Sequence, residues 1–516
     1  MRRGVLVKRP PNAQIELRPV ATEYYSVIIL LNSLIPCRLS VITTSAAMQA
    51  SPKIAIVGSG ISALAVAHAL RGRALVTLFE ASSYFGGHTH TVDVTLPTPD
   101  GLVTHGVDTG FLVFNERTYP NLIKLLADLN VETAKSDMSF SVKAAVGTAC
   151  RSLEWSGSSL NTVFAQRRNL VSPRFLRMLR DVLRFNKLAT QLAEAGEDGV
   201  LMQPMGDFLH QHEFSTEFRD WYFLPMIGCI WSCPVEQMLQ FPVATMIRFC
   251  HNHGLLQISD RPQWWTVKGG ARQYVEKITA GIADKRLNTP VRRIERDVTG
   301  VRVITDGHSE RFDKLVLATH SDQALALLGD ATPLETATLG AIRYHPNRAV
   351  LHTDTSVLPK NKLAWAAWNY ERGTGGSQSA SHHRYSTQTA QVCLHYLINK
   401  LQPIPFTQPV LVSLNPMRDI PRAHVLGEYD YAHPVFDMAA MAAQARVPQL
   451  QGQQHTYFCG AWMGYGFHED GLKAGQAAAR GLLAGFDRRA RPQVEPLMPS
   501  PMPTPMWTPE QSPELV

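Results

Sequence analysis

The sequence predicts an α/β fold with more than one domain, and three observations support that fold class. An apolar, β-rich run at residues 53–57 leads directly into a glycine-rich turn and an Ala/Leu-rich helix. A second apolar run, residues 75–79, follows that helix, as expected for parallel strands joined by a helix. The length of 516 residues exceeds what one hydrophobic core usually organises.

The glycine-rich turn at residues 58–63 reads GSGISA, a GxGxxG pattern with alanine in its third small position. Gly58 permits the tight turn, Gly60 lets a pyrophosphate approach the backbone, and Ala63 lets the helix pack on the strand. The helix N-terminus adds free N–H groups, those of Ile61 and Ser62 among them, and a positive dipole end. Strand, turn and helix together predict a Rossmann-type dinucleotide site.

The second strand ends in Glu80, twenty residues after Gly60. A carboxylate at this spacing accepts hydrogen bonds from the adenosine ribose hydroxyls. It would repel a 2′-phosphate. We therefore expect a dinucleotide without a 2′-phosphate.

Gly86, Gly87 and His88 follow, and with this segment the pattern resembles the flavin amine-oxidase superfamily. That superfamily includes monoamine and polyamine oxidases, phytoene desaturases and protoporphyrinogen oxidases. The resemblance implies FAD as the cofactor, with Gly86 and Gly87 at its diphosphate. His88 stands where many relatives carry arginine, and we expect it to donate to a phosphate.

Three further segments extend the resemblance to FAD-binding relatives. Gly110 matches a glycine that passes close to the flavin ring, and Val291 matches a position whose backbone contacts the adenine. Near the C-terminus, a short strand ends at Gly460, followed by Ala461 where many relatives carry an acid. A glycine-rich helix comes next and is implied to point its N-terminus at the flavin, with three residues at the site: Asp470, Gly471 and Leu472.

We expect Lys268 to be a catalytic residue. It precedes Gly269 and Gly270, in a setting like that of the lysine that holds a water near the flavin N5 in amine oxidases. A solvated lysine before a helix is the alternative interpretation. The resemblance implies that the substrate gives up a hydride at the flavin, and that oxygen or another acceptor then takes the electrons.

The same segments divide the chain. We expect a discontinuous FAD-binding domain from residues 48–120, 255–330 and 450–488, and an α+β substrate domain from 121–254 and 331–449. Residues 1–47 are basic and then apolar, which indicates either a leader or a mis-assigned start upstream of Met48. Residues 489–516 are rich in proline, which favours a disordered tail.

Composition excludes several other classes of protein. The formal charge of +7 suits anionic ligands, but no zinc-finger, RNA-binding or basic-arm pattern is present, so we expect no nucleic-acid partner. The seven cysteines are scattered without CxxC spacing, which predicts no disulfide framework and no metal site. Such cysteine usage is typical of a reducing compartment, so we expect a cytoplasmic protein.

Stretches 107–122, 266–275 and 464–476 are most similar to a bacterial branch of the superfamily that is associated with cyclopropane-fatty-acid synthases. That likeness implies an apolar, fatty-acyl or lipid substrate and a functional association with a fatty-acid-modifying methyltransferase. A basic amphipathic helix at residues 176–188 indicates either a solvated face or peripheral contact with the inner face of the membrane.

Three alternatives stay open. The first is an amine oxidase with an aromatic cage for the substrate cation, drawn from Trp264, Trp265, Trp462 and Tyr465. The second is a redox-neutral flavin isomerase. The third is a non-catalytic FAD-binding partner of a methyltransferase.

Overall fold

The computed structural model describes residues 51–145, 152–195, 202–257, 261–372 and 392–490. Residues 1–47, predicted as a leader or a mis-assigned start, lie outside the described residues, and so does the predicted tail from residue 491 on. Residues 489 and 490 belong to the last turn of a long helix. None of the described helices combines the length and the apolar character that a bilayer span requires.

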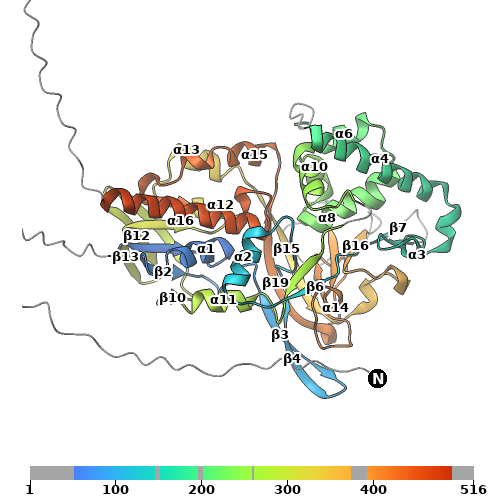
Figure 1. The fold of residues 1–516 in the computed structure, drawn as a ribbon, viewed down its shortest axis with the longest axis horizontal. Coiled ribbons are helices and arrows are strands. Elements are labelled where there is room, and N and C mark those ends of the chain that lie inside the picture. Colours follow the sequence, from blue (N-terminus) through green and yellow to red (C-terminus); the bar gives the residue numbers. More distant parts are fainter. Residues whose placement is uncertain (1–50, 146–151, 196–201, 258–260, 373–391, 491–516) are drawn as a thin grey trace, which may run out of the picture. The chain divides into compact units, whose positions relative to one another are not determined.

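A five-stranded parallel sheet forms the first layer of the fold (Figure 1). Ile56 on the central strand pairs with Leu78 on one side and Val316 on the other, and all three are fully buried. Burial on both faces explains why these strands are continuous apolar runs. The strands, in sheet order, are β10 (Asp284–Arg286), β2 (Leu75–Phe79), β1 (Lys53–Val57), β14 (Lys314–Leu317) and β20 (Thr456–Phe458). The predicted α/β class is confirmed.

The first helix of the described chain, α1 (Ile61–Ala69), packs on the last, α16 (His468–Ala490), as Figure 1 shows. A Cβ atom at Gly471 would lie 2.8 Å from Cγ2 of Ile61, and one at Gly475 would overlap the carbonyl oxygen of Ser62. Glycine at these positions therefore lets the two helix backbones approach closely. This contact joins the first and the last helix of the described chain, which both belong to the domain of the parallel sheet.

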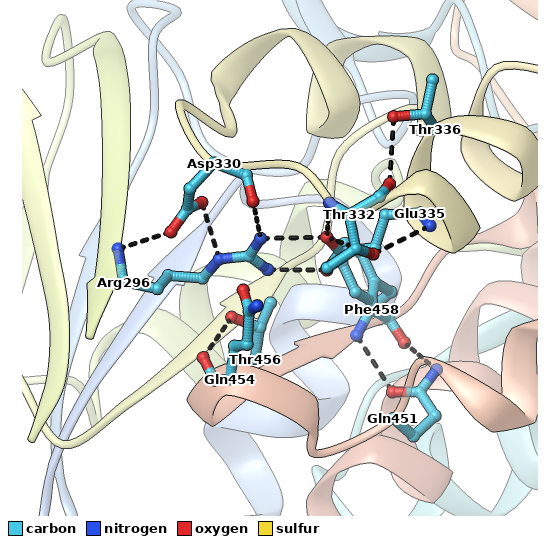
Figure 2. Close-up of polar contacts among 9 residues, drawn as sticks. All are labelled: Arg296, Asp330, Thr332, Glu335, Thr336, Gln451, Gln454, Thr456 and Phe458. Carbon is cyan, nitrogen blue, oxygen red and sulfur yellow. Dashed lines mark hydrogen bonds and ion pairs between the residues drawn. The ribbon is translucent and has the colours of Figure 1, made fainter. Parts of the chain in front are cut away.

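Polar side chains fix elements that lie around this sheet and at its edge (Figure 2). The guanidinium of Arg296, whose side chain is 1% exposed, donates to both carboxylate oxygens of Glu335 at 2.6 and 2.9 Å and to Asp330. Glu335 also closes a capping box with Thr332 at the start of α13 (Pro333–Leu339). The cluster therefore fastens α13 to the strand that carries Arg296. At the sheet edge, the amide of Gln451 pairs with both the N–H and the C=O of Phe458.

A small antiparallel sheet lies beside the parallel one. Its strands are β11 (Val291–Asp297), β12 (Gly300–Thr305) and β13 (His308–Phe312). Its apolar face, with Ile294 and Val303 fully or almost fully buried, shares a core with Leu315 and Leu317 of β14. Helices α12 (Ser321–Leu327), α13 and α15 (Met438–Gln444) complete this core.

A mixed seven-stranded sheet forms the second large layer. Neighbouring strands are antiparallel except for β16 and β7, which are parallel. The strands in order are β19 (Val425–Pro434), β15 (Tyr344–His352), β18 (Leu411–Leu414), β17 (Cys393–Leu397), β16 (Trp368–Arg372), β7 (Phe140–Ala145) and β8 (Ser152–Ser156). This layer draws on both segments of the predicted substrate domain, whose exact boundaries stay a prediction.

Helices pack with this sheet to form the largest core of the protein. α8 contacts β16, and α10 contacts α4. Their apolar stripes explain the arrangement: α4 buries Phe175, Met178 and Phe185, and α8 is buried along most of its length. The helices are α4 (Pro173–Ala195), α6 (Met205–Gln211), α7 (Thr216–Phe218), α8 (Leu224–Trp231), α9 (Val235–Leu239) and α10 (Val243–Asn252).

Short elements connect the two layers. A hairpin of β3 (Thr91–Thr98) and β4 (Gly101–Asp108) leads to a small sheet with the order β5 (Phe114–Asn115), β9 (Trp264–Val267), β6 (Thr133–Ser136). The connecting helices are α2 (Pro120–Asp128), α11 (Arg272–Thr279) and α14 (Ile398–Leu401). The helix that we expected after Gly270 is therefore present as α11.

Candidate functional site

The glycine turn between β1 and α1 has the geometry that its residues require. Gly58 has a φ of +95°, and a Cβ atom there would lie 2.8 Å from the carbonyl oxygen of Ala318. Gly60 is the N-cap of α1, and nothing lies within 4 Å of where its Cβ would be. The backbone is thus open to a ligand at Gly60, next to the free N–H groups of the helix N-terminus.

Glu80 is held in place at the end of β2. The hydroxyl of Ser59 donates to its Oε2 at 2.5 Å, and the N–H of Ser82 donates to its Oε1 at 2.8 Å. The same Ser59 oxygen accepts the N–H of Gly86 at 3.0 Å. One serine therefore couples the glycine turn, the acid and the Gly-Gly segment, which the sequence alone did not indicate.

The Gly86-Gly87 segment lies directly on the glycine turn. Gly87 has a φ of +57°, and a Cβ atom there would be 3.2 Å from Cα of Gly60. Behind this segment, a Cβ at Gly110 would overlap the carbonyl oxygen of His88. The close packing of these backbones accounts for two of the glycines that the sequence singled out, Gly87 and Gly110.

These segments line one cavity of about 1010 Å³ that continues from the parallel sheet toward the seven-stranded sheet. Its volume is at the upper end of ordinary ligand pockets, which hold about 300–1,000 Å³. Most of the predicted cofactor residues line it: Gly58, Gly60, Ile61, Ser62, Glu80, Gly86, Gly87, His88, Gly110, Val291, Gly460 and Ala461.

Four predicted cofactor residues do not line this cavity. Ala63 is fully buried in the core between helix and sheet. Gly471 and Leu472 pack inside the fold, the former against α1. Asp470 accepts the N–H groups of Tyr465 and Phe467 at 3.0 and 3.1 Å and so shapes the loop before α16.

Lys268 is not at the cavity, which differs from the expectation. It lies at the end of β9, where its ammonium group points to solvent and pairs with Glu132 at 2.7 Å. Its side chain is 61% exposed. Trp264, at the start of β9, lines the cavity, whereas Lys268 follows the end of that strand and lies outside the cavity, so the solvated alternative describes its position.

Histidines that the sequence did not single out gather around the cavity. His320, His433 and His468 line it together with His88, whose ring centroid lies 6.0 Å from that of His320 and 5.4 Å from that of His433. Burial lowers the pKa of His88 and His320 to about 4, and that of His433 and His468 to about 3. All four are therefore neutral near pH 7.

His468 is the most tightly fixed of these residues. As the first residue of α16, it stacks on Phe111 at 3.8 Å and its Nε2 lies 2.6 Å from the hydroxyl of Tyr274. That hydroxyl is in turn 2.5 Å from the Thr89 hydroxyl. His468 lies in the GYGFHEDG stretch, whose sequence predicted Asp470 at the site and not His468.

A separate polar cluster lies inside the seven-stranded sheet. Glu371, Cys393 and His395 lie close enough to share a metal ion. The Lys143 ammonium is 2.8 Å from Glu371, whose pKa is held at about 2 despite its burial because His395 and Lys143 hydrogen-bond to it. A neighbouring cation already neutralises this carboxylate, so the cluster is a hydrogen-bonded network of the sheet. The five described cysteines are buried free thiols, while Cys37 and Cys150 lie outside the described residues.

Comparison with known proteins agrees with the geometry of the site. A family model described as "Flavin containing amine oxidoreductase" matches residues 61–483. The chain belongs to this family and is a flavin-dependent oxidoreductase whose cofactor is FAD. The residues present fit that cofactor, because open backbone at Gly60, the held carboxylate of Glu80 and the Gly86-Gly87 pair lie along one wall of the cavity. Comparison with curated proteins gives no match.

Solved structures share the fold over most of the chain. Cyclohexylamine oxidase from Brevibacterium oxydans IH-35A is 18% identical, with a TM-score of 0.59 over 85% of this chain and 100% of its own. A CLA-producing fatty acid isomerase from P. acnes is 16% identical, with a TM-score of 0.55 over 84% and 98%. A putrescine oxidase bound to putrescine is 16% identical, with a TM-score of 0.56 over 84% and 99%.

Proposed function

We propose that this flavin-dependent oxidoreductase acts on an apolar substrate of the fatty-acyl or lipid class. The observation that supports this proposal is the wall of the cavity beyond the cofactor-binding segments. Its lining there is almost entirely aromatic and aliphatic, and includes Met138, Phe140, Met226, Ile230, Trp231, Phe249, Leu255, Trp264, Trp368, Leu414 and Phe436. We call this part the apolar chamber.

The charges around the cavity support an uncharged substrate body. Among its described lining residues, the only carboxylates are Glu80, which is held by Ser59 and Ser82, and Asp430, which lies exposed on β19. In the part of the chain that the structure describes, no lysine or arginine lines it. A polyamine would bring several positive charges into a space that offers them no buried counter-charge, and this desolvation is costly.

The chain's own residues have three tasks in the proposed reaction. FAD, when bound, supplies a ring that accepts a hydride. The aromatic wall excludes water from the reacting carbon, Glu80 and the glycine backbone hold the cofactor, and neutral histidines leave no free positive charge beside the substrate. The hydrogen bond between Nε2 of His468 and the Tyr274 hydroxyl fixes the His468 ring, which stacks on Phe111.

Amine oxidation is the second candidate. Trp264, Trp462 and Tyr465 line the cavity and offer aromatic faces for an amine, whereas Trp265 lies outside it and donates its indole N–H to Glu116. A small, singly charged amine would fit better than a polyamine, and the cyclohexylamine oxidase that shares the fold acts on such a compound by its name.

Redox-neutral isomerisation of an acyl chain is the third candidate, because a fatty acid isomerase shares the fold and the apolar chamber suits its class of substrate.

We also propose that the protein works in the cytoplasm, in association with a fatty-acid-modifying methyltransferase of the cyclopropane-fatty-acid synthase class. The sequence resemblance to that bacterial branch is what supports this association. Failure of the two purified proteins to form a complex or to stimulate each other's turnover would contradict it.

An anaerobic substrate screen tests the proposed function. The FAD-loaded protein is mixed with oleate, methyl oleate, putrescine or cyclohexylamine, and the visible flavin absorbance is followed. Bleaching by the acyl compounds and not by the amines supports the proposal. Bleaching by amines alone contradicts it in favour of amine oxidation, and a moved double bond without lasting bleaching identifies an isomerase.

A charge placed in the apolar chamber sharpens this test. Met138→Glu puts a carboxylate on the chamber wall, where it should raise KM for an acyl substrate at least tenfold, about 1.4 kcal/mol, because an acyl chain cannot pair with it. Met417→Glu is the matched control, since Met417 is 44% exposed and lies outside the cavity. Equal KM values in the two variants would contradict an acyl substrate in this chamber.

A further inference from the structure

Exposed aliphatic side chains are concentrated on one region of the protein. Of the fourteen large hydrophobic residues that are exposed in the described chain, five lie between residues 160 and 183. Such clustering differs from the scattered apolar residues of an ordinary surface and marks an interaction site. The five are Leu160 (80% exposed), Leu170 (51%), Val171 (81%), Leu176 (44%) and Leu183 (56%).

These residues come from three consecutive elements: α3 (Leu160–Val163), η1 (Arg167–Val171) and α4. Arg167 fastens the first two together by donating to the carbonyl of Phe164 and to the side chain of Asn161. η1 contacts α4 directly. The three elements that carry the exposed aliphatic residues are therefore held next to one another in the fold.

Helix α4 divides cleanly into two faces. Its buried face carries Phe175, Met178, Phe185 and Ala189. Residues 176, 180, 183 and 187 recur at helical spacing on the opposite face, so that leucine alternates there with a basic residue: Leu176, Arg180, Leu183, Lys187. The outward face of α4 therefore presents two exposed leucines among its basic side chains.

The same region is strongly basic. It contains Arg167, Arg168, Arg174, Arg177, Arg180, Arg184 and Lys187. The acids that pair with them are Asp181 and Glu217, whose side chains are 1% and 6% exposed, so five positive charges are in excess. The arginines of α4 keep between 44% and 71% of their side chains exposed despite these pairs.

We infer that residues 160–187 form a docking face for an anionic phospholipid bilayer, with the leucines and Val171 inserted and the basic side chains at the lipid phosphates. Aliphatic residues that alternate with long basic ones suit a membrane interface, because arginine and lysine extend to the headgroups while their stems lie among the acyl chains. Each basic residue near an anionic surface adds attraction that salt screens.

The docking face lies close to the apolar chamber. Phe175, on the inner face of α4, contacts Trp155 with 6.1 Å between ring centroids. Trp155 in turn contacts Phe140, which lines the chamber, at the same distance. Two ring contacts thus separate the docking face from the chamber wall. The inference does not depend on the proposed substrate, since it rests on the exposed surface alone.

Vesicle flotation of the FAD-loaded full chain tests the inference. Vesicles of phosphatidylcholine alone are compared with vesicles that also contain phosphatidylglycerol, at low and high salt. We expect binding to the phosphatidylglycerol vesicles that high salt weakens, and little binding to the neutral ones. No binding to either, or equal binding to both, would overturn the inference.

Two double variants separate the apolar and the electrostatic contributions. Leu176→Ser with Leu183→Ser, and Arg180→Glu with Lys187→Glu, should each reduce vesicle binding at least tenfold. The matched controls are Leu102→Ser on the β3–β4 hairpin, 77% exposed, and Lys124→Glu on α2, 75% exposed. FAD content and melting temperature confirm folding. Unchanged vesicle binding in both double variants would assign the docking to another surface, and turnover of a water-soluble substrate without vesicles reports separately on the proposed function.

Discussion

At the scale of single residues, the two glycines of the β1–α1 turn have different roles, and a matched pair of alanine substitutions distinguishes these roles. Gly60→Ala should leave the melting temperature of the apoprotein unchanged, because nothing lies within 4 Å of the added methyl group, but should weaken FAD binding at least tenfold. Gly58→Ala should destabilise the apoprotein by about 1–2 kcal/mol, because φ is +95° there and Ala318 is in the way.

The measurements are thermal unfolding of the apoprotein and titration with FAD, followed by flavin fluorescence. Wild-type affinity for FAD in Gly60→Ala would mean that the cofactor does not approach this backbone. A reduced melting temperature in that variant would instead point to a packing role for Gly60.

At this scale, the sequence brings residues together most directly where one short segment carries the signal. The turn at residues 58–63, Glu80 and the Gly86-Gly87 pair were all indicated by spacing within one βαβ unit, and all but the buried Ala63 line the cavity. Lys268 was selected by its setting alone, and a setting does not fix the direction of a side chain: in the structure Lys268 pairs with Glu132 in solvent, outside the cavity. Ser59, which joins three parts of the site, has no sequence signal beyond its place in the turn.

At the scale of elements, the crossing of α1 and α16 depends on a glycine that faces the partner helix. Gly475→Ala should destabilise the protein by about 1–3 kcal/mol, because its methyl group would overlap Ser62 and lie 2.8 Å from Cβ of Ala65. Gly485→Ala, in the same helix with nothing within 4 Å, should stabilise it by about 0.5–1 kcal/mol through helix propensity.

Urea unfolding of the two variants measures both effects against the wild type. A stabilised Gly475→Ala would show that the helices can separate without cost. The result also bears on interpretation of the sequence, since the glycines of this helix were assigned to the flavin. In the structure, Gly471 and Gly475 serve the packing of α16 on α1, and the first residue of the helix, His468, reaches the cavity.

At the scale of the whole molecule, the parallel sheet was predictable and the apolar chamber was not. The three central strands of the parallel sheet, β2, β1 and β14, are local apolar runs. The chamber is assembled from Met138, Met226, Phe249, Trp368 and Phe436, which come together only through the pairing of the seven-stranded sheet and the packing of α8 and α10. No local pattern encodes that long-range register, so the sequence could suggest an acyl substrate only through a family resemblance and not through the chamber itself.

Buried histidines give the whole molecule a definite response to acid. Burial lowers the pKa of His88, His253 and His320 to about 4, and that of His433 and His468 to about 3, from an ordinary value of 6.5. The unfolded chain takes up protons that the folded protein cannot. The stability that these groups contribute is therefore complete above pH 6.5 and is lost as the pH falls toward 4, by up to about 1.4 kcal/mol per pH unit for each histidine.

Replacing one of these histidines tests this account. His433→Asn keeps an acceptor for the Asn347 amide, which lies 3.0 Å from Nδ1 of His433, but removes one titrating ring. The free energy of unfolding of the apoprotein, measured in urea between pH 4.5 and 6.5, should then depend less steeply on pH, by about one proton. His308→Asn, at the exposed first residue of β13, is the matched control for removal of a histidine outside the cavity. If His433→Asn keeps the wild-type slope, His433 is protonated in the folded protein, and the cavity carries a positive charge that an apolar substrate would have to tolerate.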